Sequence, residues 1–169
     1  MSAYAAFLRA VNVGGTGKLP MAELRAMCES IGFSNVRTYI ASGNVVFDSK
    51  LAEAKVKAKL ERSLEAYAGK RVGVLVRTGA ELAAVLSANP FKDAAPNRTV
   101  AIFLDAPPAA DVLSDVSGQQ AEELAVGKRE IYVHYRQGIA HSKLKIPGAT
   151  EGTARNMNTI AKLVEWTKG

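Results

Sequence analysis

The chain has 169 residues, of which 48% are hydrophobic and 22% are charged, and this composition suits a folded core and excludes a disordered chain. No run reaches the roughly 18 apolar residues of a membrane span, and residues 1–4 lack the basic and apolar layout of a secretory signal. The single cysteine, Cys28, excludes an internal disulfide and is typical of a reducing compartment. We therefore expect a cytoplasmic protein that does not bind a membrane.

The charge is positive overall and unevenly distributed along the chain. The net charge is +6 and the isoelectric point is about 9.5. Residues 1–90 hold 12 Lys and Arg against 7 Asp and Glu, residues 91–127 hold 2 against 6, and residues 128–169 hold 8 against 3. This segregation favours an anionic partner, although an ordinary surface rich in lysine would give the same numbers.

The first half of the chain alternates strand-like and helix-like segments. Strands are predicted at residues 3–11, on both sides of a turn at 42–44, and at 72–77. Helices are predicted from Pro20 to a stop at Gly32, and over residues 51–68, where Ser49 is the expected cap. The stripe predicted to face inward on the second helix ends at Tyr67. The resulting order, strand–helix–strand–strand–helix–strand, is the split βαβ plan.

The second half repeats this order loosely after a capping box and a boundary. Thr78 and Glu81 have the spacing of a capping box at the start of a short helix. A polar, proline-containing segment at 89–98 predicts the boundary between halves 1–90 and 91–169. We expect a strand at 99–104, a short helix from Pro107 through Val116, and a hairpin at 123–135. Residues 153–156 should then cap a final helix.

Three patches of the sequence resemble one known family. They are residues 7–15 (FLRAVNVGG) with Pro20 and Met21, residues 39–47 (YIASGNVVF), and residues 153–156 (TARN) ahead of a helix. Together they are similar to the bacterial domain of unknown function 1697, over essentially the whole chain. The resemblance implies an α+β fold of two ferredoxin-like (split βαβ) halves packed together, and it implies no activity.

The same patches contain polar side chains that no strand or helix requires. We predict that six of them form one ligand site: Arg9, Asn12, Ser42, Asn44, Arg155 and Asn156. Guanidinium forks, amide donors and a helix N-terminus suit a phosphate or carboxylate, and Arg37 is a further member of these patches. The alternative is structural: the asparagines would stabilise a turn and cap a helix, and the arginines would pair with glutamates.

The glycine-rich segment at residues 12–18 allows two interpretations. Successive backbone N–H groups there could form a small concavity for an anion, or the segment could be a flexible turn into the helix. It is not a phosphate-binding loop of the Walker type, because Leu19 follows Lys18 where that motif needs Ser or Thr.

Catalytic groups are sparse in the sequence. His134 and His141 are not spaced for a metal with another ligand, and no serine lies in a nucleophile elbow. We therefore expect no metal and no cofactor, and the identity of any catalytic residue stays unknown. The interpretation we favour is a binding module for a small anionic or phosphorylated ligand; a nucleic-acid-binding module and an enzyme of unidentified type remain the alternatives. The sequence does not determine the oligomeric state.

Overall fold

The fold is mixed α+β, with two four-stranded antiparallel sheets among the described residues. The computed structural model describes residues 1–9, 19–40, 43–140 and 142–168. Across these ranges, four α-helices accompany the sheets. None of these helices has the length and apolarity that a membrane span requires.

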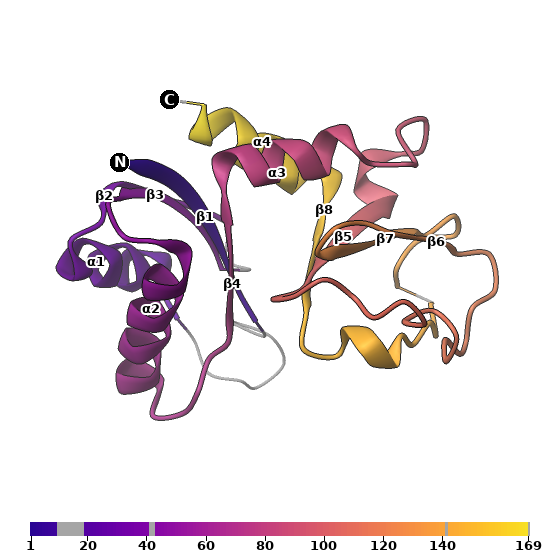
Figure 1. The fold of residues 1–169 in the computed structure, drawn as a ribbon, viewed down its shortest axis with the longest axis horizontal. Helices are drawn as coiled ribbons and strands as arrows, with labels where there is room; N and C mark the ends of the chain where they lie inside the picture. Colours follow the sequence, from indigo (N-terminus) through magenta and orange to yellow (C-terminus); the bar gives the residue numbers. More distant parts are fainter. Residues whose placement is uncertain (10–18, 41–42, 141, 169) are drawn as a thin grey trace. The chain divides into compact units, whose positions relative to one another are not determined.

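The first sheet has the strand order β2-β3-β1-β4, and each neighbouring pair is antiparallel. Its strands are β1 (Ser2–Leu8), β2 (Ser34–Tyr39), β3 (Asn44–Ser49) and β4 (Val74–Thr78). Helices α1 (Met21–Ile31) and α2 (Glu53–Ala68) connect β1 to β2 and β3 to β4, and both lie on one face of the sheet (Figure 1).

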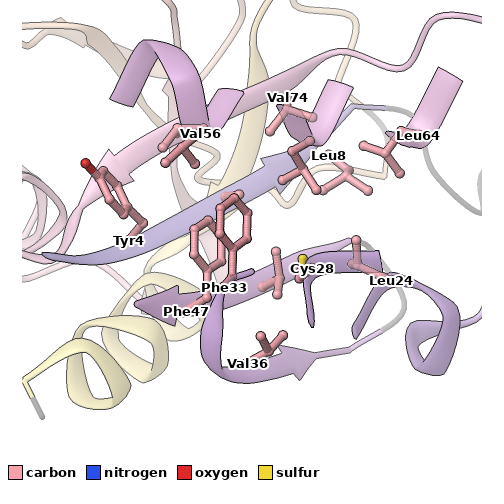
Figure 2. Close-up of a cluster of buried hydrophobic side chains, with 14 of the residues drawn as sticks. Tyr4, Leu8, Leu24, Cys28, Phe33, Val36, Phe47, Val56, Leu64 and Val74 are labelled. Atoms are coloured by element: carbon pink, nitrogen blue, oxygen red, sulfur yellow. The ribbon is translucent and has the colours of Figure 1, made fainter. Parts of the chain in front are cut away.

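A cluster of buried hydrophobic side chains forms the core between this sheet and its two helices. Every second side chain of β1, at Tyr4, Ala6 and Leu8, belongs to this cluster. The rings of Phe33 and Phe47 stack in this cluster (Figure 2), and their centroids are 4.2 Å apart. Cys28 also lies in the cluster and is buried.

Two expectations about α2 are wrong. Ser49 does not cap it: the helix begins at Glu53, and the Ser49 hydroxyl accepts a hydrogen bond from the Leu51 N–H at 3.1 Å. Serine competes for nearby backbone groups in such turns, which delays the start of the helix. Tyr67 is 48% exposed rather than buried, because the buried stripe ends one turn earlier, at Leu64.

The capping box is confirmed at α3 (Gly79–Ser87). The Thr78 N–H donates to Glu81 Oε1 at 2.9 Å, and the Glu81 N–H donates to Thr78 Oγ1 at 3.1 Å. These reciprocal bonds satisfy two backbone donors that the helix start would otherwise leave without partners. The short 3₁₀ turn Pro96–Arg98 follows and leads into the second sheet.

The second sheet has the strand order β6-β7-β5-β8, again antiparallel throughout. Its strands are β5 (Thr99–Phe103), β6 (Glu123–Val126), β7 (Glu130–His134) and β8 (Thr153–Asn156). Val100, Ile131 and Val133 are buried on one face in a separate core cluster, and Tyr135 packs against it. Helix α4 (Met157–Thr167) follows β8 directly.

One prediction for the second half is wrong, and another is incomplete. No helix follows Pro107: the described residues between β5 and β6 form turns, in which the Ser114 hydroxyl bonds the Asp111 carbonyl at 2.7 Å. A segment this short, with local side-chain bonds, does not offset the cost of starting a helix. Residues 153–156 provide the expected cap, because Asn156 Oδ1 accepts the Thr159 N–H at 2.9 Å, but they also form strand β8 and pair with β5, which was not predicted.

The chain divides into two compact units. The first comprises residues 1–82 and 163–169, and the second comprises residues 83–162. These bounds differ from the predicted halves 1–90 and 91–169, because α3 and α4 each contribute residues to both units. Each unit contains one of the two sheets.

Candidate functional site

Arg9 follows the last residue of β1 and is half-buried. Its backbone N–H donates to the Gly73 carbonyl at 2.9 Å, beside β4. Its side chain runs over the same glycine, where an added Cβ would lie only 3.0 Å from Arg9 Cδ. Glycine at position 73 therefore leaves room for the aliphatic stem of this arginine.

Asn44 is fully buried at the start of β3. Its side-chain Nδ2 donates to the carbonyl of Tyr39, the last residue of β2, at 3.0 Å. The two residues also face each other in the register of the strands. This contact is what the structural alternative predicts for Asn44.

Arg155 and Asn156 lie in β8, in the second unit. Arg155 Nη1 donates to Thr153 Oγ1 at 2.8 Å and to the Ala154 carbonyl at 2.9 Å, and burial lowers the pKa of this guanidinium to about 10. Asn156 Oδ1 accepts the Thr159 N–H at 2.9 Å, so Asn156 caps α4. Each of these hydrogen bonds joins residues that are close in sequence.

The structure describes four of the six residues predicted to form the ligand site. Asn12 and Ser42 lie outside the described residues, as does the glycine-rich segment up to Lys18. Arg9 and Asn44 belong to the first unit, whereas Arg155 and Asn156 belong to the second. Their convergence on one site stays a prediction.

A different arginine of the same patches, Arg37, has the contacts of a ligand-binding group. The guanidinium carbon lies 3.8 Å from the centroid of the Trp166 ring, so the planar group stacks on the indole face. Tyr39 packs edge-on against the same indole, with centroids 5.5 Å apart. In the part of the chain that the structure describes, Arg37 has no hydrogen-bonded or ion-paired side-chain partner, and its side chain is exposed.

Irregular backbone adjoins this arginine. The register between β2 and β3 shifts between Ser34 and Arg37, as in a β-bulge, and Asn35 in the bulge has a φ of 52°. That conformation is uncommon for any residue other than glycine. The Asn35 side chain donates from Nδ2 to Asp48 Oδ2 at 2.7 Å. Bulges redirect side chains and occur often beside functional sites, so this irregularity marks the same edge of the sheet.

These side chains line a hollow of about 360 Å³ at the β2–β3 edge of the first unit. Its polar lining comprises Asn35, Arg37, Asp48 and Thr167, and Trp166 supplies an aromatic wall. The volume falls within the range of small-molecule sites in proteins, about 300–1,000 Å³. We call this hollow the β2–β3 groove.

A second polar cluster lies on the second sheet. His134 Nδ1 and Glu123 Oε1 are 2.9 Å apart, and Arg136 Nε donates to the same carboxylate oxygen at 3.0 Å. Hydrogen bonds from His134 and Arg136 hold the pKa of Glu123 below its ordinary value. Each group is satisfied by its neighbours. The described residues contain no group of three or more His, Cys, Asp and Glu that could hold a metal.

Comparisons with known proteins identify the family. The family model described as "Protein of unknown function (DUF1697)" matches residues 1–132. The chain belongs to the DUF1697 family. The match includes β2 and β3 of the groove, and it ends before Arg155, Asn156 and Trp166, so it is shorter than the resemblance read from the sequence.

One solved structure resembles this DUF1697 chain over nearly its full length. It is described as the structure of conserved bacterial protein SP0830 from Streptococcus pneumoniae, with 27% identity and a TM-score of 0.79. The alignment covers 97% of each chain. No curated protein matches the chain.

Sequence reasoning found part of the β2–β3 groove. Arg37 belonged to the polar residues of the family-like patches but was not placed in the predicted site. The spacing of Arg37 and Tyr39 on one strand was the sequence feature that could have placed Arg37 beside an aromatic residue, since residues two apart share a face. Trp166 lies near the C-terminal end of α4, and its contact with Arg37 depends on tertiary structure that the sequence does not reveal.

Proposed function

We propose that this DUF1697 protein binds a small anionic ligand, carrying a phosphate or a carboxylate, in the β2–β3 groove. The observation that carries the proposal is the Arg37 guanidinium, which is stacked on Trp166, exposed, and not ion-paired with any described residue. A planar guanidinium presents a fork of N–H donors that matches the oxygens of phosphate and carboxylate groups.

The stack on Trp166 prepares Arg37 for such a ligand. An arginine side chain loses conformational freedom when it is held in one geometry, and the indole face restricts it before the ligand arrives. The net charge of +6 would also raise the local concentration of anions near the protein. The proposal keeps the ligand class predicted from the sequence and assigns it to a different arginine.

We also infer that each unit is a variant of the ferredoxin-like, split βαβ fold. The first unit supports this through its order of elements, its antiparallel strand order β2-β3-β1-β4, and two helices on one face of the sheet. The second unit supports it less fully, because turns replace the helix between β5 and β6. A location in the bacterial cytoplasm remains part of the proposal.

The test uses the chain's only tryptophan, Trp166, as an internal reporter. Inorganic phosphate, citrate and a panel of sugar phosphates would be titrated while the indole fluorescence is followed. Replacing Arg37 with Met should weaken binding by roughly ten- to a hundredfold, the size of a charge-assisted hydrogen bond of about 1.5–3 kcal/mol.

The matched control is Arg25→Met on α1, an exposed arginine whose nearest acidic partner is Glu29 at 3.7 Å. This variant should bind as the wild type does. Equal affinities for the wild type and the Arg37→Met protein, confirmed by calorimetry, would reject the groove as the anion site.

A basic stripe on α2 favours nucleic acid as a second candidate ligand. Lys55, Lys59 and Arg62 follow one another at helical spacing, are exposed, and have no ion-pair partner among the described residues. If the stripe neutralises three phosphates of single-stranded nucleic acid, the logarithm of affinity should fall with the logarithm of salt with a slope of about −2. Replacing all three residues with Glu should abolish this salt-dependent binding, and absence of any binding by the wild type at about 50 mM salt would exclude the candidate.

A further inference from the structure

The β2–β3 groove contains a negative group as well as Arg37. Asp48 lines the same hollow, on the strand next to Arg37. We propose that the ligand is a small zwitterion, whose phosphate or carboxylate binds Arg37 and whose amino group binds Asp48. This inference rests on the proposed function and adds the identity of the second ligand group.

The strand register places the two charged residues at neighbouring positions of one face. Arg37 is paired with Val46, and Asp48 lies two residues farther along β3. Residues two apart on a strand point to the same face, about 6.6 Å from each other along the strand. The charges therefore occupy successive positions along the groove, which suits an elongated ligand with one charge at each end.

The two groups do not neutralise each other. No ion pair joins Arg37 to Asp48 in the described structure, although both line one hollow. Arg37 is instead held on the face of Trp166. Because the two charges are not ion-paired with each other, each is available to the complementary end of a dipolar ligand.

Asn35 fixes the carboxylate that would receive the amino group. Its Nδ2 donates to Asp48 Oδ2 at 2.7 Å, from the bulge in which Asn35 has a φ of 52°. The other oxygen, Oδ1, has no hydrogen-bond donor among the described residues. Because an ionised carboxylate only accepts hydrogen bonds, the ligand group that completes it must be a donor such as an ammonium.

Asp48 also supplies selectivity against other anions. A ligand that carries only negative charge would place that charge near the carboxylate, and the repulsion would weaken its binding. A zwitterion of the same size replaces this repulsion with a charge-assisted hydrogen bond. The groove should therefore discriminate between two phosphate monoesters that differ only in an amino group.

The experiment compares phosphoethanolamine and 3-aminopropyl phosphate with ethyl phosphate, which lacks the amine, and with ethanolamine, which lacks the phosphate. Binding to the full chain is followed by Trp166 fluorescence and by calorimetry. At least one amino-phosphate should bind tenfold or more tightly than ethyl phosphate.

Asp48→Asn should remove this preference, because it retains an acceptor for Asn35 and loses the charge. Asp111→Asn, which alters an exposed aspartate of the second unit, should keep the preference.

The outcomes separate this inference from the proposed function. Equal binding of ethyl phosphate and both amino-phosphates, lost in Arg37→Met, would overturn the zwitterion and leave the anion site in place. A preference for the amino-phosphates that persists in Asp48→Asn would equally overturn the assigned role of Asp48. Absence of binding by every phosphate compound, and by citrate in the first titration, would overturn both proposals.

Discussion

At the scale of single residues, hydrogen-bond partners distinguish polar side chains that stabilise the fold from those that are available to bind a ligand. Asn44 and Asn156 both bond a backbone group within five residues, and the described donors of Arg155 bond Thr153 and Ala154. Arg37 instead stacks on an aromatic ring, and the residue is exposed. Sequence alone assigned all four to the same patches, since it records a residue's type and neighbours but not its contacts.

Cys28 gives a residue-scale prediction about reactivity. Burial, with a smaller effect of Glu29, raises the pKa of its thiol to about 12. Because the thiolate is the nucleophile and an ordinary cysteine has a pKa of about 8.5, the reactive fraction at pH 8 should fall by roughly three orders of magnitude. A disulfide reagent should therefore label the native protein very slowly and the guanidinium-unfolded protein at once.

The control for this measurement is a protein with Cys28→Ser and a new cysteine at the exposed position Ser114. That thiol should react rapidly in the native state. Rapid stoichiometric labelling of Cys28 itself under native conditions would contradict its place in the core.

At the scale of elements, local chemistry made the first unit predictable and the second less so. The stop of α1 at Gly32, which has a φ of 105°, and the capping box at Thr78 depend on residues close in sequence. Strand β8 does not: four residues that include Arg155 and Asn156 have little strand propensity, and pairing with β5 determines their conformation. The groove could not be predicted for the same reason. Its β2 and β3 residues are close to one another in sequence, but Trp166 is far from them in sequence.

At the scale of the whole molecule, the chain contains two units that share a helix. Residues 157–162 of α4 belong to the second unit, and residues 163–167, including Trp166 of the groove, belong to the first. Ile160 and Leu163, on either side of this junction, are both fully buried. We expect this continuous helix to couple the stability of the two sheets, because unwinding it would expose apolar side chains that are buried in the folded chain.

A proline at Ala161 tests this coupling. Ala161 is exposed and lies inside α4, so the substitution removes a helical hydrogen bond and costs about 3 kcal/mol without disturbing a core side chain. Trp166 fluorescence should report unfolding of the first unit, and hydrogen exchange of β5 and β7 should report the second. For a chain of this size, both should show a midpoint about 6–12 °C lower than in the wild type.

Ala161→Gly, which keeps the backbone N–H, should lower both midpoints by only about 2–4 °C. A proline variant in which the Trp166 transition stays at the wild-type temperature while the second unit loses protection would show that the shared helix does not couple the units.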